Sequence, residues 1–491
     1  MSIYNNDDIK LLQENLSLLD NIIEQRKAEL YEPFKKEKDE VSKIILDFIK
    51  KNKRKIYGGY AINKLVADKD PKDAFYKEYQ TPDIDFYSPT PIEDLMNLCN
   101  IIYESGHKRV SGQEAQHKDT YSIFVNFTLY CDISYVPRNI YNRLPFKELN
   151  GVYYTHPHFI TIDYLRMITD PLESYWRIDK SVKRFTLLQK HYPLPTIDKP
   201  IKIVDSTPDL ELAVKKIINF LNNRKSCITI GFYAYNHFIN ASEIKNKTIK
   251  TIKVPYVEFI STKYKDDFDE LMSELRKELP DSNLTHKEFF PFFQFTGYSV
   301  EIYLENDLIA TIYTDNKKCY PFIKVNTLEF DNDKTNKIKG EIIIGSFSLT
   351  LLYAQIMVMK YRTINDDDMK NVYMIIVSHL LSCKKEFFKK NKKTLLDDTV
   401  FKDFVVDCMG YTVDPKRERQ LLLESRKNKG KRIIFRYEPS KDVKEADTTF
   451  KFANYSGNEI KNERNLQLIN KTKSEEDDED NNEELESEES K

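Results

Sequence analysis

Thr81-Pro82-Asp83-Ile84-Asp85-Phe86 reads as a strand that carries two carboxylates on one face. Side chains alternate between the two faces of a strand, so Asp83 and Asp85 project together while Ile84 and Phe86 enter the core. Two carboxylates placed in this way repel each other unless a positive charge lies between them. A divalent cation is the obvious candidate for that charge. An exposed edge strand that tolerates the pair is the alternative.

A second alternating stretch, residues 122–135, supplies a third carboxylate. Its apolar positions are Ile123, Val125, Phe127, Leu129, Cys131 and Ile133. Asp132 lies on the opposite, more polar face of this predicted strand. If the two strands are neighbours, one face of a small sheet carries Asp83, Asp85 and Asp132. The sequence therefore predicts a metal site formed by three carboxylates, the hard oxygen ligands that Mg²⁺ prefers.

A glycine pair precedes both strands. Gly58 and Gly59 follow a basic, strand-like stretch and lead into residues 60–65, which are compatible with a helix. A strand that turns through glycines into a helix presents backbone N–H groups and the positive end of the helix dipole to phosphate oxygens. The pair is thus a candidate phosphate-binding turn, and an ordinary turn is the alternative.

Taken in order, these three elements resemble the DNA polymerase β-like nucleotidyltransferase superfamily. Its pattern is Gly-Gly or Gly-Ser, then Asp-hydrophobic-Asp, then an acidic residue on a later strand, and the match spans residues 56–135. The resemblance implies that Asp83 and Asp85 are catalytic and bind two ions, Mg²⁺ or Mn²⁺. It also implies that Asp132 binds the ion that activates the primer 3′-hydroxyl, and that Gly58 and Gly59 contact the nucleotide.

Later segments are similar to the poly(A) polymerase catalytic subunits of poxviruses and giant DNA viruses, including their mimivirus-like branch. They are Asp163-Tyr164-Leu165-Arg166-Met167-Ile168-Thr169-Asp170-Pro171, Ser174-Tyr175-Trp176-Arg177 with Lys180, and Phe404-Val405-Val406-Asp407-Cys408-Met409-Gly410. This resemblance implies template-independent addition of poly(A) from ATP to mRNA 3′ ends, in the cytoplasm of an infected cell and in the virion. Carboxylates do not choose the base, so terminal uridylyl or CCA-type addition stays open, as does a non-catalytic RNA-binding scaffold.

The second half of the chain contains a degenerate copy of the first. Residues 58–63 match residues 231–236 at a separation of 173, and the same separation maps Phe86 to Phe259. After a three-residue slip, residues 93–96 match residues 269–272. In the copy, Tyr256, Glu258 and Ala310 stand where the first half has Asp83, Asp85 and Asp132. One acid of three cannot hold two metals, so we expect the copy to be inactive.

These patterns predict an α+β fold in which a mixed-sheet nucleotidyltransferase domain is followed by a degenerate nucleotidyltransferase-like domain. The expected parts are an N-terminal helical region (1–50), a catalytic domain with a trailing helix (51–195), a degenerate domain with helices (196–440), a basic or polar extension (441–473) and an acidic disordered tail (474–491).

The trailing helix is expected to begin at Asp170-Pro171 and to end near residue 191. Its apolar positions share one stripe, which predicts burial: Leu172, Tyr175, Trp176, Val182, Phe185 and Leu188. Arg177, Lys180 and Lys183 on this helix are candidates for binding the triphosphate or RNA, and a solvated helix face is the alternative. Further on, residues 401–409 read as another helix, and the basic stretch 416–436 is a candidate RNA-binding segment.

The charge distribution suits a polyanionic partner. Eleven acidic residues and no basic ones lie between Glu475 and Glu489, so the net charge of -2 hides a basic body. Six cysteines without metal-ligand spacing indicate a reducing compartment. The uncharged run 342–359 is interpreted as a buried strand and a core helix, so we expect no membrane partner. The expected partners are ATP and an RNA 3′ end, with a homodimer and a separate processivity subunit both open.

Overall fold

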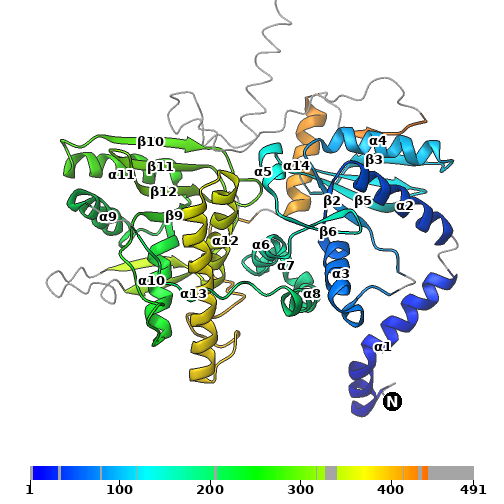
Figure 1. The fold of residues 1–491 in the computed structure, drawn as a ribbon, viewed down its shortest axis with the longest axis horizontal. Helices are drawn as coiled ribbons and strands as arrows, with labels where there is room; N and C mark the ends of the chain where they lie inside the picture. The colour runs from blue at the N-terminus through cyan, green and yellow to red at the C-terminus, as the bar shows by residue number, and fades with distance from the viewer. Residues whose placement is uncertain are drawn as a thin grey trace, which may run out of the picture.

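The computed structural model describes residues 4–30, 35–77, 80–117, 119–203, 207–316, 318–326, 340–412, 414–429 and 434–440. Two mixed sheets form two lobes, and helices α6, α7 and α8 lie between them (Figure 1). This α+β architecture confirms the fold class expected from the sequence. The predicted extension (441–473) and acidic tail (474–491) lie outside the described residues.

The first sheet runs in the order β16-β3-β4-β5-β2-β1-β7-β6. Its strands are β1 (Lys55–Tyr57), β2 (Ile84–Ser88), β3 (Val110–Glu114), β4 (Thr120–Val125), β5 (Thr128–Tyr135), β6 (Phe146–Leu149), β7 (Val152–Thr155) and β16 (Arg436–Tyr437). Its helices are α3 (Gly58–Lys69), η1 (Pro71–Asp73), α4 (Pro91–Glu104), α5 (Arg138–Arg143) and α6 (Pro157–Ile168). Strand β2 pairs with β1 antiparallel and with β5 parallel, and the apolar side chains Ile56, Phe86 and Ile133 of these strands are buried.

The second sheet runs in the order β10-β11-β12-β9-β8-β14-β13-β15. Its strands are β8 (Cys227–Ile230), β9 (Val257–Ser261), β10 (Leu284–Phe289), β11 (Ser299–Leu304), β12 (Asp307–Thr314), β13 (Tyr320–Asn326), β14 (Glu341–Gly345) and β15 (Cys408–Met409). Its helices are α9 (Pro208–Leu221), α10 (Gly231–Ser242), α11 (Tyr264–Glu278), α12 (Phe347–Thr363) and α13 (Asp367–Asn391). Strand β14 and helix α12 confirm the interpretation of residues 342–359 as a buried strand followed by a core helix.

The two sheets share one strand order, which confirms the internal repeat. Strands β3-β4-β5-β2-β1-β7-β6 of the first correspond to β10-β11-β12-β9-β8-β14-β13 of the second. Strands β2 and β9 begin 173 residues apart, as do helices α3 and α10. Gly58 and Gly231 open these helices with φ angles of +70° and +63°, a backbone conformation that favours glycine.

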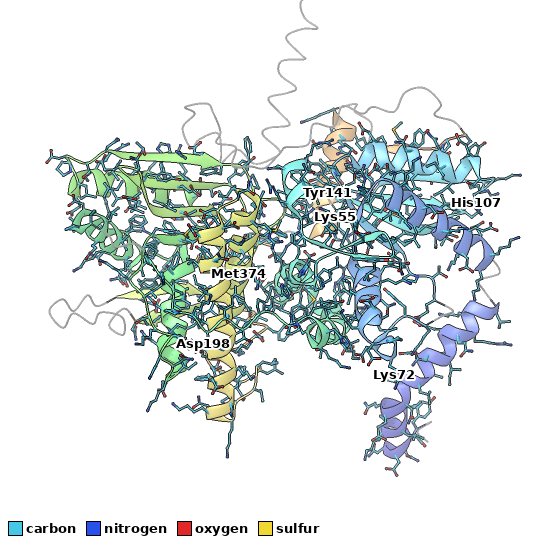
Figure 2. The ribbon with its side chains drawn as sticks, viewed as in Figure 1. Lys55, Lys72, His107, Tyr141, Asp198 and Met374 are labelled. Carbon is cyan, nitrogen blue, oxygen red and sulfur yellow. A yellow bond between two sulfur atoms is a disulfide. The ribbon has the colours of Figure 1, made fainter. Side chains whose placement is uncertain are left out.

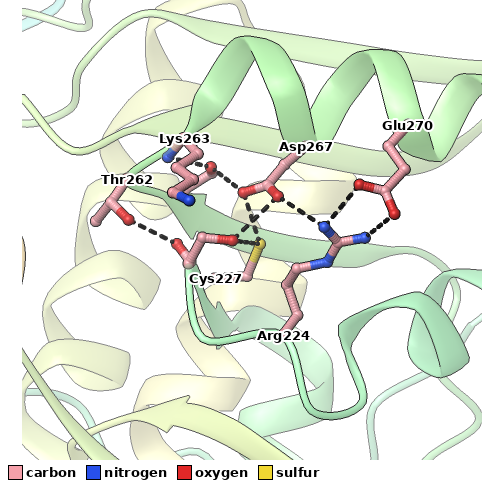
Figure 3. Close-up of polar contacts among 8 residues, drawn as sticks. Arg224, Cys227, Thr262, Lys263, Asp267 and Glu270 are labelled. Atoms are coloured by element: carbon pink, nitrogen blue, oxygen red, sulfur yellow. Dashed lines mark hydrogen bonds and ion pairs between the residues drawn. The ribbon is translucent and has the colours of Figure 1, made fainter.

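The three-residue slip expected in the repeat is wrong. Helices α4 and α11 also begin 173 residues apart, so Asp94 corresponds to Asp267 and not to Glu270. Arg54 Nε lies 2.6 Å from Asp94 Oδ2, and Arg224 Nη1 lies 3.3 Å from Asp267 Oδ1. Figure 3 shows the second of these pairs, with Arg224 also reaching Glu270. Because both aspartates are buried, each copy holds its helix to the sheet with the same ion pair.

The trailing helix differs from its prediction. It is broken into α7 (Pro171–Ser174), the 3₁₀ turn η2 (Tyr175–Arg177) and α8 (Ile178–His191). The break rotates the first part of the expected apolar stripe into solvent. Tyr175 and Trp176 are 70% and 65% exposed, and only the second part of the stripe packs inward, with Leu188 buried.

The N-terminal region forms α1 (Asn6–Leu30) and α2 (Lys35–Lys51), as expected for a helical region. Helix α2 packs against the first sheet through Val41, Ile45 and Ile49, all fully buried. Helix α1 extends away from the lobe (Figure 1), and its stripe of Leu12, Leu16, Leu19 and Ile23 is exposed.

The C-terminal segments contradict two expectations. Residues 401–409 do not form a helix, because Phe404 has a φ angle of +56° and residues 408–409 pair with β13. Helix α14 (Pro415–Asn428) and β16 return to the first lobe, although residues up to 440 were assigned to the second domain. Arg426 of α14 forms an ion pair with Glu114 of β3, so part of the basic stretch 416–436 serves as an anchor.

The cysteines also differ from the expected reduced state. Strand β15 brings Cys408 beside β13, and Cys408 forms a disulfide with Cys319 at a Cα–Cα distance of 5.3 Å. The other four cysteines are free and buried. As for membranes, none of the helices in the described ranges combines the length and the apolar character needed to span a bilayer.

Candidate active site

The three predicted carboxylates meet on one face of the first sheet, at its central strands β2 and β5. Asp85 of β2 and Asp132 of β5 are register partners on adjacent parallel strands, so their side chains project from the same face. Asp83 directly precedes β2 and is exposed, whereas Asp85 and Asp132 are half-buried. Each acid lies within electrostatic range of the other two. The structure therefore brings together the three residues that the sequence singled out.

Crowding shows in the protonation of these groups. Burial, followed by the charges of Asp83 and Asp132, raises the pKa of Asp85 well above its ordinary value, and nearby Arg184 offsets only part of this. Burial also raises the pKa of Asp132, although a hydrogen bond from Ser122 opposes the shift. A bound cation would relieve this repulsion, and carboxylates are suitable ligands for Mg²⁺ or Mn²⁺. The residues therefore fit a divalent metal.

The aspartates alone do not form a complete metal site. Within the part of the chain that the structure describes, no group of three His, Cys, Asp or Glu side chains is arranged to hold a metal ion by itself. A Mg²⁺ ion here would need further ligands from substrate phosphate and water, which this ion usually keeps.

The glycine turn lies directly against the carboxylates. A Cβ atom on Gly58 would lie 2.3 Å from Asp85 Oδ2, so the acid occupies the space above the turn. A Cβ atom on Gly59 would lie 2.6 Å from both Arg184 Nη1 and Tyr76 Oη. Glycine is favoured at Gly58 by its φ angle of +70°, whereas at Gly59 a larger residue would displace the ends of the Arg184 and Tyr76 side chains. Side chains, and not only a phosphate, therefore approach the turn closely.

The basic residues predicted on the trailing helix separate into two groups. Lys180 lies within electrostatic range of Asp83 and Arg184, and partial burial with the charge of Arg184 lowers the pKa of Lys180. Arg177 lies in the turn η2, within electrostatic range of Lys180. Lys183 is exposed and pairs with Asp179 at 2.8 Å, an arrangement that agrees with the alternative of a solvated helix face.

Sequence reasoning missed Arg184. Its guanidinium donates to Tyr76 Oη at 3.0 Å and lies over the rings of Phe75 and Tyr76, next to Gly59. The spacing of Arg177, Lys180 and Arg184 is i, i+3, i+7, which places them on one helix face. That spacing was the signal in the sequence that could have identified Arg184.

The basic stretch before the glycine turn does not face the site. Arg54 is held by Asp94, as described above. Lys55 Nζ donates to the carbonyl oxygens of Tyr141 and Leu144 at 2.5 and 2.8 Å, and Figure 2 shows Lys55 and Tyr141 together. Burial lowers the pKa of Lys55 to about 8. These two cations are bonded to groups of the fold itself, Asp94 for Arg54 and two backbone carbonyls for Lys55.

The corresponding site on the second sheet, at strands β9, β12 and β11, is built differently. Glu258 stands at the position of Asp85 and pairs in register with Thr311, so Thr311 and not Ala310 replaces Asp132. Glu301 of β11 is the register partner of Thr311, and it adds a second acid that the sequence analysis overlooked. Lys360 Nζ of α12 lies 2.9 Å from Glu301 Oε1, with both side chains nearly buried. A lysine therefore provides positive charge beside Glu301 in the second sheet.

Comparisons with known proteins agree with this geometry. The family model "Poly(A) polymerase catalytic subunit" matches residues 43–174, and "APMV, Putative poly(A) polymerase, catalytic subunit, C-terminal" matches residues 186–470. A "Putative poly(A) polymerase catalytic subunit" of Acanthamoeba polyphaga mimivirus is 36% identical over 488 residues, covering 93% of this chain and 83% of the relative. A protein with the same description from African swine fever virus (strain Badajoz 1971 Vero-adapted) is 29% identical over 180 residues, covering 35% of this chain and 37% of the relative.

A solved structure extends the match to the whole fold. The crystal structure of the Megavirus polyadenylate synthase superposes with a TM-score of 0.87 at 35% identity, covering 95% of this chain and 94% of that one. The two family models together span both lobes. The chain belongs to the poly(A) polymerase catalytic subunit family and is an enzyme of that class.

Proposed function

We propose that this poly(A) polymerase transfers adenylyl groups from ATP to an RNA 3′ end, with two divalent cations bound by Asp83, Asp85 and Asp132. The observation that carries the proposal is the register pairing of Asp85 with Asp132 beside the glycine turn. Transfer forms a bond between the RNA 3′ oxygen and the α-phosphorus of ATP and releases pyrophosphate. Divalent cations, when bound, polarise phosphoryl oxygens and favour ionisation of the attacking hydroxyl.

The remaining residues position the reactants. Ser122 Oγ donates to Asp132 Oδ1 at 2.6 Å, which orients this carboxylate and leaves Oδ2 for another partner. The turn at Gly58 opens α3, whose first N–H groups and dipole favour a phosphate. Lys180 and Arg184 add positive charge on the side of Asp83 and Asp85, where a triphosphate would need it.

The choice of ATP rests on family membership, because the carboxylates themselves do not select the base. A labelled RNA primer incubated with the purified chain and each nucleoside triphosphate in turn, and then with CTP and ATP together, tests it with Mg²⁺ and with Mn²⁺. We expect extension with ATP and not with the other three nucleotides. Extension only with UTP would support uridylyl addition, and extension that requires CTP and ATP together would support CCA-type addition.

A non-catalytic RNA-binding scaffold is the remaining alternative. The same assay with Asp132→Asn separates it from an enzyme, and Glu258→Gln in the second sheet is the matched control. We expect the first variant to lose extension and the second to retain it. A wild-type chain that binds RNA without extending it under every condition would favour the scaffold.

We further propose that the enzyme works with a protein partner that binds helix α1. The exposed leucine and isoleucine stripe of α1 supports this proposal, because such a face is usually covered. Light scattering of the purified chain distinguishes a homodimer from a monomer that requires a separate processivity subunit.

We also propose that the enzyme acts in the cytoplasm of an infected cell. Imaging of the tagged protein during infection tests this location.

A further inference from the structure

Two aromatic side chains beside the candidate active site are exposed against expectation. Tyr175 and Trp176 were predicted to pack inward, yet they are 70% and 65% exposed, and Leu172 next to them is 50% exposed. Trp176 is the single tryptophan of the chain. Large aromatic side chains in solvent, gathered in one short turn, mark a binding surface more often than isolated exposed residues do.

The turn that presents them is fixed. Ser174 Oγ donates to the carbonyl oxygens of Met167 and Asp170, each at 2.6 Å, which ties η2 to the end of α6. Pro171 opens α7 and is buried. The backbone that carries the two rings is therefore fixed before any ligand arrives, which reduces the entropic cost of binding.

One neighbour of Trp176 is basic. The guanidinium carbon of Arg177 lies 4.3 Å from the centroid of the Trp176 ring. Arginine in this position provides positive charge for a phosphate next to a base that stacks on the ring. Tyr175 adds a second ring directly before it in the chain.

A line of positive charge leads from this turn to the carboxylates. Arg177, Lys180 and Arg184 share one face of α8 and the turn before it. Lys180 is within electrostatic range of Asp83, and Arg184 is within range of Asp85. Seven helical residues rise by about 10 Å, so the backbone of the turn is separated by about that much along the helix axis from Arg184, which lies within electrostatic range of Asp85.

We propose that Tyr175 and Trp176 form a stacking platform for bases of single-stranded RNA a few nucleotides upstream of the 3′ end, with Arg177 and Lys180 contacting the backbone. The inference rests on the proposed function and adds a specific RNA site to it. Aromatic rings interleaved with cations match a strand of stacked bases and phosphates. An apolar protein partner would instead leave these cations unpaired.

The tryptophan allows a direct test. The Asp85→Asn variant, which should bind RNA without extending it, is titrated with an oligoadenylate of about 15 nucleotides, within the range of known single-strand site sizes. We expect quenching of Trp176 fluorescence that saturates with RNA binding measured by anisotropy. Polyphosphate, which has the charge but no bases, should compete for RNA and leave the fluorescence unchanged.

Substitution supplies the second measurement. In the Asp85→Asn background, Trp176→Leu should weaken oligoadenylate binding roughly 5- to 150-fold, because stacking on one ring contributes about 1–3 kcal/mol. Trp176→Phe should retain most of the affinity. Tyr103→Leu removes an exposed aromatic ring from α4 and should change nothing. In the otherwise wild-type enzyme, Trp176→Leu should raise the KM for primer and leave the KM for ATP unchanged.

The outcomes separate the platform from the chemistry. Fluorescence quenching together with an inactive wild-type enzyme would support the platform and overturn the proposed function. Active wild-type enzyme whose tryptophan is unaffected by RNA, with Trp176→Leu binding as tightly as wild type, would overturn the platform alone. A change of oligomeric state in Trp176→Leu, with unchanged RNA affinity, would overturn it in favour of a protein contact. An unchanged melting temperature checks that each variant is folded.

Discussion

The two sheets place an acid at the same position and balance its charge in different ways. In the first sheet, Asp85 lies beside Asp83 and Asp132, and Arg184 offsets only part of their repulsion. In the second, Glu258 lies near Glu301, which pairs with Lys360 of α12. The site on the first sheet fits exchangeable cations, whereas the corresponding site on the second sheet has a permanent cation from its own chain.

The side chains around Glu258 also differ from those around Asp85. Tyr256 replaces Asp83, and its hydroxyl contacts those of Tyr361 and Tyr373. Tyr373 donates to Glu258 Oε2 at 2.6 Å, and all of these side chains are buried. We infer that a duplicated scaffold changes from a reactive to a structural role when a lysine supplies the charge and aromatic rings fill the space beside it.

The largest expected difference is in catalysis. Asp85→Asn should lower the rate of primer extension at least about 10³-fold, because a lost metal ligand removes several kcal/mol of transition-state stabilisation. Glu258→Gln at the corresponding position should leave the rate within about twofold, a small change in barrier. Single-turnover extension with saturating ATP measures both. Equal losses of extension rate in the two variants would show that Glu258 takes part in the reaction.

Lys360 should matter most for stability. Lys360→Met leaves Glu301 nearly buried without its partner, and breaking such a pair costs about 3 kcal/mol. Adding Glu301→Gln to this variant should recover part of the loss. Denaturant unfolding measures both effects, with the exposed Lys183→Met as a control that should behave like wild type. A Lys360→Met variant as stable as wild type would remove the lysine from its assigned role.

The pH dependence of unfolding sharpens the same contrast. Burial raises the pKa of Glu258 to about 7 in the folded chain, even though a hydrogen bond from Tyr373 and the charge of Lys360 act in the opposite direction. The unfolded chain releases this proton near its ordinary pKa of 4.5, so wild-type stability falls as the pH rises from 4.5 to 7.

A variant without this proton should lack that loss. We expect Glu258→Gln to gain stability relative to wild type across the window, by roughly 3 kcal/mol at its upper end. Unfolding curves for both proteins at pH 5 and pH 7.5 give the difference. A difference that stays constant with pH would mean that Glu258 is ionised throughout the window.

The smallest effect on stability concerns the matched glycines. Gly231→Ala places a Cβ atom 2.0 Å from Glu258 Oε2 at a positive φ angle, and Gly58→Ala meets Asp85 in the same way. Each should cost about 1–2 kcal/mol of stability, from the left-handed backbone alone. Only Gly58→Ala should also abolish extension, and assays of both variants show whether the two turns still share a function.

Local patterns were sufficient for much of the fold and for the carboxylates. Alternation placed Asp85 and Asp132 on one face of adjacent strands, and the constant separation of 173 residues revealed the repeat. Both are properties of neighbouring residues or of a copied segment. The reversed positions of acid and hydroxyl in the second sheet, Glu301 beside Thr311, needed the strand register.

What the sequence did not reveal depends on contacts between distant elements. Lys360 is 102 positions from Glu258 in the chain, and no periodic pattern connects them. Strand β16 returns to β3 across more than 300 residues. The exposure of Trp176 follows from the break at Ser174, whose side chain donates to the carbonyl oxygens of Met167 at the end of α6 and of Asp170. The pattern of apolar residues alone indicated one continuous buried stripe.

The most direct test locates the cations. Crystals grown with Mn²⁺ and a non-hydrolysable ATP analogue should show anomalous scattering from two ions beside Asp83, Asp85 and Asp132, and none beside Glu258 and Glu301. Manganese beside Glu258 and Glu301 would contradict the assignment of a catalytic role to the first sheet and a structural role to the second. An ATP analogue bound beside Asp85 with no manganese near Asp132 would contradict it as well.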